Sequence, residues 1–296
     1  MDRQLLRSAA HRLFSPARHH LETLYLFTRS DYKTIFFPVA IFAAVAAPYS
    51  GPKQLLDTLV WVWFHLLQAN VSNQTFSSDE DIVNKPWRPL PSRRVTVQQA
   101  RTLRWCLMFW CLYFSSLFGP RVVLASAGLT IVEIVHDDFN LSSRPVLKSL
   151  CNLGGYLTFE VGATLVLSPT RTFDKTALIA LACSTLIIFT TIHAQDFADV
   201  EGDKVSGRRT IPIIAPEGAR ISMLALLLGW STILAALWGL GPVSGALFFA
   251  MGGFVGARYF SLRDEKDDRI SYLLYNMWLV SAHVLPANAR VSALFW

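Results

Sequence analysis

Residues 73–89 read NQTFSSDEDIVNKPWRP and stand between segments that are almost entirely apolar. The stretch holds three consecutive acids at 79–81, followed by Lys85 and Arg88, which have the geometry to reach phosphate oxygens. Charged groups beside lipid-embedded helices are costly and therefore mark functional sites. We expect this stretch to hold an anionic ligand through a metal ion.

Apolar runs recur along the whole chain of 296 residues, of which 52% are hydrophobic. Each run approaches the ~20 residues that a helix needs to cross a bilayer. The pattern predicts an all-α, polytopic membrane protein with about nine transmembrane helices. The expected spans are residues 33–49, 55–71, 103–119, 121–137, 151–168, 176–194, 221–239, 242–260 and 271–288.

Basic residues are distributed unevenly between the loops. If the nine spans alternate in direction, 22 of the 27 lysines and arginines fall on one face. The positive-inside rule places that face, with the N-terminus and the polar loops, in the cytosol. The net charge of +6 follows from this asymmetry, so it requires no nucleic-acid partner, and no protein partner is evident. The four cysteines lack metal-ligand spacing and are interpreted as small hydrophobes.

The N-terminal segment has several arginines and leucines but no uninterrupted apolar core before a cleavage site. This composition predicts an interfacial helix rather than a signal peptide. We expect a cytosolic or interfacial segment over residues 1–32 and a single transmembrane domain over residues 33–296.

An oxygen-rich stripe is expected where the second span enters the first polar loop. If the helix continues, Asn73, Ser77 and Asp81 share one face, with Gln74 beside them. Oxygen ligands suit Mg²⁺, which usually takes one or two carboxylates together with substrate phosphates. An isolated acidic run is more often a solvated loop, so this interpretation depends on a second cluster.

The second cluster is residues 193–213, HAQDFADVEGDKVSGRRTIPI. On one helical face, Asp196, Asp199 and Asp203 would stand at i, i+3 and i+7. The bases that follow are Lys204, Arg208 and Arg209. Both clusters lie on the same predicted face with acids before bases. Two such loops together indicate a diphosphate held through magnesium ions, which turn the diphosphate into a better leaving group.

Further polar residues lie near or within the spans. Lys148, Asn152 and Tyr156 share one helical face, and Lys148 is either a phosphate ligand or a positive-inside anchor. Glu133 and Glu160 lie at membrane depth, where each could deprotonate an intermediate or simply satisfy a neighbouring helix.

Both loops resemble those of the UbiA superfamily of intramembrane prenyltransferases. The resemblance covers nearly the whole chain and is carried by NKPWRP at 84–89 and by DVEGDKVSGRRT at 199–210. It implies nine transmembrane helices in one bundle, with a central cavity capped by cytosolic helical loops. It also implies two acidic loops that bind a prenyl diphosphate through Mg²⁺ at the lipid bilayer.

The first loop departs from the usual Asn-Asp-x-x-Asp-x-x-x-Asp pattern of that superfamily. The matching positions are Asn73, Gln74, Ser77 and Asp81, so two carboxylates are missing. This variant resembles the fungal branch that includes membrane-bound terpene cyclases. It implies a class I cyclase that ionises farnesyl or geranylgeranyl diphosphate with Mg²⁺, cyclises the carbocation and releases diphosphate. The alternatives are prenyl transfer to an aromatic or other lipophilic acceptor, and a non-catalytic lipid-binding or transport protein.

The same resemblance assigns roles to individual residues. The expected metal ligands are Asn73, Asp79, Asp81, Asp196, Asp199 and Asp203, of which Asn73, Asp81, Asp199 and Asp203 are the expected catalytic residues. The expected diphosphate ligands are Lys85, Arg88, Lys148, Lys204 and Arg208. The fungal resemblance further implies a multi-pass protein of the endoplasmic reticulum membrane, with these loops in the cytosol.

Overall fold

The computed structural model consists of helices and turns throughout the part of the chain that it describes. The described residues are 17–48, 51–77, 81–82, 85–139, 145–205 and 207–290, and none of them is in a strand. The prediction of an all-α protein is therefore confirmed.

The described helices follow one another with short connections. In order they are η1 (Tyr32–Phe36, a π-helix), α2 (Phe37–Ala46), α3 (Pro52–Phe76), α5 (Val97–Ser116), α6 (Pro120–Asp137), α7 (Pro145–Leu167), α8 (Lys175–Thr191), η3 (Ile192–Gln195, a 3-10 helix), α9 (Val200–Val205), α10 (Ile211–Ile214), α11 (Pro216–Leu237), α12 (Pro242–Ser261), α13 (Glu265–Val284) and α14 (Ala287–Arg290). A further helix covers residues 17–28.

Local sequence explains where several of these helices begin. Gly51 and Gly119 adopt a φ of +110° directly before Pro52 and Pro120, which start α3 and α6. Glycine tolerates that conformation, and proline at the first helical position loses no intrahelical hydrogen bond. The α5 helix begins at a capping box, in which Thr96 caps the first turn and the Gln99 side chain reciprocates.

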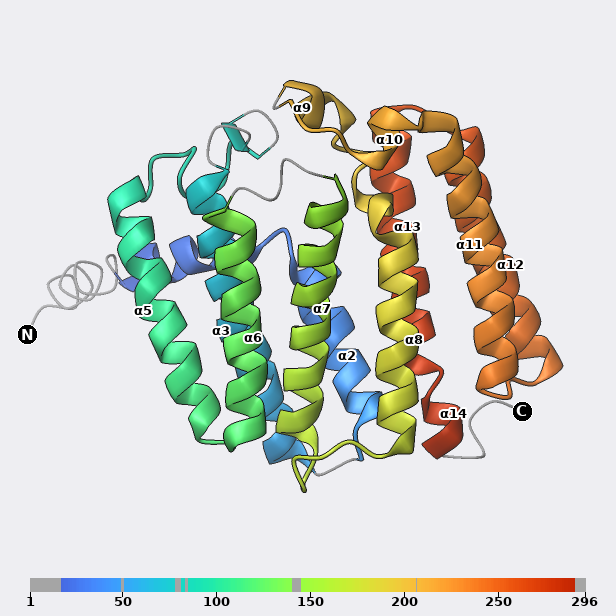
Figure 1. Cartoon of the computed structure of the whole chain (residues 1–296), viewed down its shortest axis with the longest axis horizontal. Helices are drawn as coiled ribbons and strands as arrows, with labels where there is room; N and C mark the ends of the chain where they lie inside the picture. The colour runs from blue at the N-terminus through green and yellow to red at the C-terminus, as the bar shows by residue number, and fades with distance from the viewer. Residues whose placement is uncertain are drawn as a thin grey trace, which may run out of the picture.

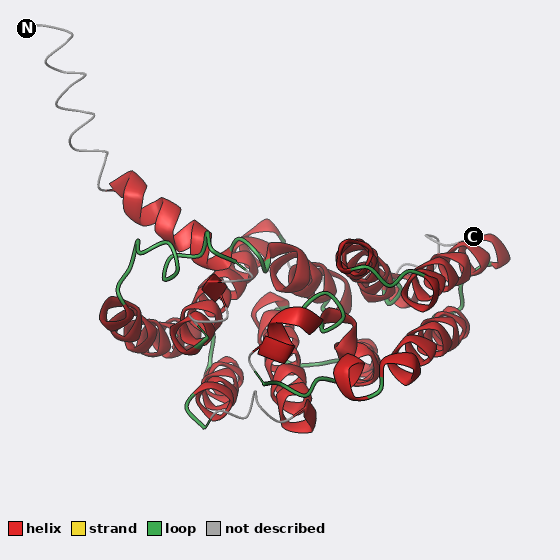
Figure 2. Ribbon diagram, turned by 90° about the horizontal axis from the view of Figure 1, so that it is seen from above, coloured by secondary structure: helices red, strands yellow, loops and turns green. Residues whose placement is uncertain are grey.

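The long helices stand side by side with their connections gathered at two ends (Figure 1). The C-terminal ends of α3 and α6, the N-terminal end of α7, and α9 lie at the same end, at the top of Figure 1. The helix of residues 17–28 instead runs across the direction of the bundle, as Figures 1 and 2 both show. The interfacial placement of residues 1–32 remains a prediction.

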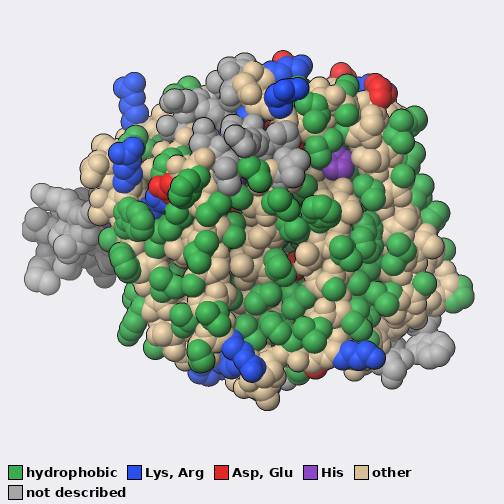
Figure 3. Space-filling view, viewed as in Figure 1, with side chains coloured by type: hydrophobic (Ala, Val, Ile, Leu, Met, Phe, Trp, Pro, Cys, Tyr) green, Lys and Arg blue, Asp and Glu red, His purple; other side chains and the backbone are tan. Residues whose placement is uncertain are grey.

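Four described helices are long and apolar enough to cross a membrane: Ser149–Leu167, Lys175–Gln195, Pro216–Leu237 and Pro242–Ser261. Each of the nine expected spans overlaps one of the helices α2, α3, α5, α6, α7, α8, α11, α12 and α13. The number nine remains a prediction. On the face drawn in Figure 3, hydrophobic side chains cover the middle, and Lys and Arg gather at the upper and lower edges. Such a belt is typical of a lipid-facing surface.

Two apolar cores hold the two halves of the bundle together. One joins α2, α3, α6 and α7 around Trp61, and the other joins α2, α8, α11, α12 and α13 around Trp278. Helices approach closely at Gly162, where an added Cβ would lie 2.1 Å from the ring of Trp61. An added Cβ at Gly252 would lie 2.2 Å from Oγ of Ser231. Small residues at these positions allow the tight packing expected between membrane helices.

Candidate active site

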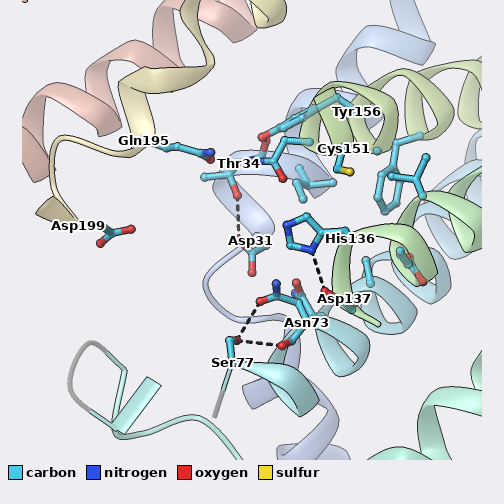
Figure 4. A pocket seen from close by; sticks show the side chains of 18 of the residues that line it. Asp31, Thr34, Asn73, Ser77, His136, Asp137, Cys151, Tyr156, Gln195 and Asp199 are labelled. Atoms are coloured by element: carbon cyan, nitrogen blue, oxygen red, sulfur yellow. Dashed lines mark hydrogen bonds and ion pairs between the residues drawn. The ribbon is translucent and has the colours of Figure 1, made fainter. Parts of the chain in front are cut away.

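A cavity of about 280 Å³ opens between the two acidic loops, at the end of the bundle where those loops lie. Its walls come from η1, α3, α6, α7 and α13 and from the turn that follows η3. Figure 4 shows polar side chains from both loops pointing into the same space. Residues more than one hundred positions apart therefore share one site.

The first acidic loop reaches the cavity through the end of α3. This helix ends at Phe76, and Ser77 has left the helical conformation with φ −108° and ψ 22°. The expected continuous helix to Asp81 is therefore interrupted. Asn73, Ser77 and Asp81 nevertheless all line the cavity, and Oγ of Ser77 donates to the Asn73 carbonyl at 2.9 Å. Three oxygen-bearing side chains of the expected stripe thus face one space.

Gln74 does not join that stripe, which corrects the sequence expectation. Its side chain is fully buried, and its Nε2 donates to the carbonyl of Phe27 at 2.8 Å. Successive helical residues point about 100° apart, so a neighbour of Asn73 faces a different partner. Gln74 therefore connects α3 to the N-terminal helix and is absent from the cavity lining.

Asp81 is held in a buried ion pair. Nη1 of Arg88 donates to both carboxylate oxygens of Asp81, at 2.7 and 2.9 Å, and Nη2 donates to Oγ of Ser30 at 3.0 Å. Both partners are buried, with Asp81 at 3% and Arg88 at 5% exposure. Burial raises the pKa of the Asp81 carboxyl, whereas the neighbouring charges of Arg88 and Lys85 oppose that rise. Arg88 thus fixes the loop as well as lining the cavity.

The second acidic loop is a turn between two short helices, η3 and α9. The expected single helical face is therefore broken, because Asp196 and Asp199 lie in the turn and Asp203 lies in α9. Asp196 and Asp199 line the cavity. In Figure 4, Asp199 lies across the cavity from Asn73 and Ser77.

The remaining predicted residues of the second loop have different surroundings. Asp203 is 1% exposed and accepts from Nη1 of Arg208 at 3.2 Å. Arg208 lines the cavity, whereas Asp203 is not among its lining residues. Lys204 pairs with Glu201 at 2.9 Å on the outer side of α9 and lines a separate hollow. The structure therefore brings Arg208 to the cavity and places Lys204 outside it.

Several lining residues were not among the predicted site residues. Asp31, which directly precedes η1, accepts a hydrogen bond from Oγ1 of Thr34 at 3.2 Å. His136 and Asp137 end α6, and Nδ1 of His136 lies 2.8 Å from Oδ1 of Asp137. The available sequence signal was an acid or histidine at the expected cytosolic end of a span, namely Asp31 before the first span and the pair at the end of the fourth.

The α6 and α7 helices supply the far wall of the cavity. Asn152 and Tyr156 both line it, and Oη of Tyr156 donates to the Thr34 carbonyl at 3.0 Å. Glu133 also lines the cavity, whereas Glu160 does not. The side chain of Lys148 and all of Asp79 lie outside what the structure describes, so their predicted roles remain predictions.

The inner part of the cavity is mainly apolar. Its apolar lining is Ile35, Ala69, Leu129, Val132 and Phe159, and Asn70 and Glu133 lie beside it in the sequence, while the acids and bases of the loops surround the mouth. A polar mouth above an apolar floor suits a ligand with an anionic head and a hydrocarbon tail.

The donor set fits magnesium. The mouth offers carboxylate, amide and hydroxyl oxygens, which are the ligands of a hard cation. No group of three His, Cys, Asp or Glu in the described residues is already clustered to hold a metal alone. That arrangement suits an ion that keeps waters and completes its shell with substrate phosphates.

Fold and cavity together define a polytopic α-helical membrane protein with acids and bases around the mouth of an apolar cavity. The chain belongs to the UbiA prenyltransferase family, which matches residues 35–280. The resemblance seen in the sequence is therefore confirmed.

Named relatives include fungal terpene-forming enzymes. The chain is 32% identical to the fumagillin beta-trans-bergamotene synthase of Aspergillus fumigatus, over 92% of this chain and 93% of that protein. It is 26% identical to a diterpene cyclase of Hericium erinaceus, over 89% and 87%. A UbiA homolog from Archaeoglobus fulgidus, solved bound to DMAPP and Mg²⁺, has the same fold, with a TM-score of 0.67 and 15% identity over 92% of this chain and 99% of that chain.

Proposed function

We propose that this protein is a membrane-embedded class I terpene cyclase. It ionises a polyprenyl diphosphate, farnesyl or geranylgeranyl, with Mg²⁺, cyclises the resulting carbocation and releases diphosphate. One observation carries the proposal: both acidic loops line a single cavity whose inner part is mainly apolar. Similarity to a bergamotene synthase and a diterpene cyclase supports it.

The mouth of the cavity would take the diphosphate. Residues that would hold Mg²⁺ are Asn73, Asp81, Asp196 and Asp199 on the cavity wall, with Asp79 and Asp203 as further expected members. When bound, the metal supplies the Lewis acid that makes diphosphate a good leaving group. Lys85, Arg88 and Arg208 line the same mouth and would bind the remaining phosphate oxygens. Lys148 stays an expected ligand, and Lys204 would have to turn inward to become one.

The inner part of the cavity would fold the hydrocarbon chain. Leu129, Val132 and Phe159 offer it no hydroxyl or amine, so they exclude nucleophiles from the cation. The rings of Phe159, Tyr156 and Tyr272 also line the cavity, and each aromatic face can stabilise a nearby cation by roughly 0.5 to 2 kcal/mol.

The direct test uses the purified full chain in detergent or liposomes. It is incubated with farnesyl or geranylgeranyl diphosphate and Mg²⁺ in the absence of any acceptor, and the organic extract is analysed by gas chromatography and mass spectrometry. We expect a cyclic terpene together with released diphosphate. Omitting Mg²⁺ should stop both.

Prenyl transfer is the second candidate, because the family to which the chain belongs is described as a prenyltransferase family. A transferase would form product only when an aromatic or other lipophilic acceptor is added. The neutral side chains at Gln74 and Ser77 favour the cyclase. Absence of turnover with every prenyl diphosphate, with or without acceptors, would instead support a non-catalytic lipid-binding or transport protein.

We also propose that the protein lies in the endoplasmic reticulum membrane with the cavity mouth facing the cytosol. The excess of basic residues in the loops at that end supports this orientation. A cysteine introduced at Lys204, which is exposed, should react with an impermeant thiol reagent added to the cytosolic side of sealed microsomes.

A further inference from the structure

We propose that Glu133 is the catalytic base that accepts the proton lost in the last step of cyclisation. This inference rests on the proposed cyclase function. Every cyclase that ends in a hydrocarbon must remove a proton from its final carbocation, and the two acidic loops sit at the mouth rather than beside the apolar part of the cavity.

The position of Glu133 in α6 places it beside the expected hydrocarbon. It lies three to four residues before His136 and Asp137, which corresponds to about 5 Å along the helix axis. Those two residues end the helix at the mouth, so Glu133 lies deeper. Leu129 and Val132, on the same helix, line the cavity with it. Among the described lining residues, Glu133 is the acid that shares its helix turn with the apolar floor.

The described hydrogen bonds of Glu133 involve one of its two carboxylate oxygens. Its Oε2 accepts from Nε2 of Gln68 at 2.8 Å, and the same Nε2 lies 3.1 Å from Oγ1 of Thr130. Its Oε1 is buried and has no hydrogen-bond partner in the described structure. A carboxylate oxygen without a donor keeps its lone pairs for a substrate proton. Gln68 therefore orients the carboxylate through Oε2, while Oε1 is held by no donor in the described part of the chain.

Burial makes the missing hydrogen bond of Oε1 costly. Glu133 is 7% exposed, and a buried polar atom without a partner costs free energy. Glu160 also has a buried oxygen, Oε2, without a hydrogen-bond partner in the described structure, so the missing partner alone does not distinguish the two acids. Glu133 differs because it lines the cavity together with Leu129 and Val132, whereas Glu160 is absent from the lining.

Transfer of this proton to Glu133 ends the reaction. A C–H bond next to the cationic carbon breaks, and its electron pair forms the new C=C bond. The proton bonds to Oε1 of Glu133, so the carboxylate becomes a neutral carboxylic acid and the cation becomes a neutral hydrocarbon. The acid then returns its proton to the departing diphosphate or to water at the mouth.

Glu160, the other acid at membrane depth in the sequence, has a different environment. It is fully buried, accepts from Oγ of Ser184 at 2.6 Å and lies 3.6 Å from Nε2 of His283. It is absent from the cavity lining. Glu160 therefore serves as a control, because it is also buried and also has one oxygen without a hydrogen-bond partner in the described structure, but does not line the cavity.

The test compares Glu133→Gln with Glu160→Gln in the full-length protein, measuring diphosphate release and product distribution separately. We expect Glu133→Gln to keep diphosphate release within a few-fold of wild type. Its main deprotonated hydrocarbon should fall by about 100-fold per diphosphate released, which is the low end for a positioned proton acceptor. Alcohols from water capture and hydrocarbons from earlier deprotonation should replace it. Glu160→Gln should retain the wild-type product ratio.

An unchanged product ratio in Glu133→Gln would overturn the proposal and leave the released diphosphate as the base. Loss of diphosphate release in a folded Glu133→Gln variant would also overturn it, because it would place Glu133 in ionisation. Glu133→Asp, which draws the carboxylate back by one methylene, should give an intermediate product shift and provides the answer if the glutamine variant does not fold. A wild-type protein that forms no terpene without an acceptor would refute the cyclase function itself, which is a distinct result.

Discussion

In the first acidic loop the described carboxylate, Asp81, is already paired with Arg88, whereas in the second loop Asp199 faces the cavity without an ion pair in the described part of the chain. The other cavity-facing groups also differ. The first loop offers the amide of Asn73 and the hydroxyl of Ser77, and the second offers a further carboxylate at Asp196.

The two loops also share a feature. Each pairs its last acid with an arginine a few residues downstream, Asp81 with Arg88 and Asp203 with Arg208. We infer that these pairs hold the loops in shape, in addition to the metal and diphosphate binding proposed for Asp81, Asp203, Arg88 and Arg208. Among the described cavity-lining residues, the second loop offers two carboxylates, and the first loop offers one carboxylate beside the neutral oxygens of Asn73 and Ser77.

Substitution of Asp199 should have the largest effect. Asp199→Ala removes a cavity-facing charge and should lower the rate of diphosphate release by at least about 100-fold. Asn73→Ala, which removes a neutral ligand from the first loop, should cost less. Both rates are measured at saturating Mg²⁺, with Glu201→Ala as the control, because Glu201 is exposed in α9 outside the cavity. Equal losses in the two loops would contradict the unequal division of charge.

Breaking the buried pair of the first loop should have the next largest effect. Arg88→Met leaves Asp81 buried without its partner and should lower the free energy of unfolding by about 3 kcal/mol. Arg208→Met should cost less, because the Arg208 side chain is 19% exposed and water can reach it. Thermal unfolding in detergent measures both changes. The double variant Asp81→Asn/Arg88→Met, with no charge left uncompensated, should recover part of the loss.

The smallest effects should come from restoring the missing carboxylates. Ser77→Asp adds an acid on the cavity wall and should lower the Mg²⁺ concentration needed for half-maximal activity. Gln74→Asp should give no such gain and should cost about 1 to 3 kcal/mol of stability, because it removes the hydrogen bond to the Phe27 carbonyl. Titration with Mg²⁺ and thermal unfolding of both variants distinguish the two positions. A lower Mg²⁺ concentration for half-maximal activity in Gln74→Asp would show that its side chain can turn into the cavity.

Much of this architecture could be predicted from the sequence. Apolar runs located helices, each of which overlaps an expected span, and the order of acids and bases located both loops. These features depend on composition and spacing, which are independent of how the helices pack.

The features of the site that could not be predicted depend on where the helices end and on the tertiary fold. Helical spacing places Asp196, Asp199 and Asp203 on one face only if the helix is continuous, but η3 ends at Gln195 and α9 begins at Val200. The hydrogen-bond partner of Gln74 could not be predicted either, because a carbonyl 47 residues away is brought near only by the tertiary fold. Asp31 carried too little local pattern to be distinguished from an ordinary loop acid.

The composition of the cavity wall implies an order of events. Six of the described lining residues are Asp or Glu and three are Lys or Arg, so the wall has an excess of formal negative charge. A diphosphate brings further negative charge and is repelled until that excess is offset. Divalent cations should consequently enter before the substrate or together with it, and the empty mouth should discriminate against free phosphate compounds that arrive without metal.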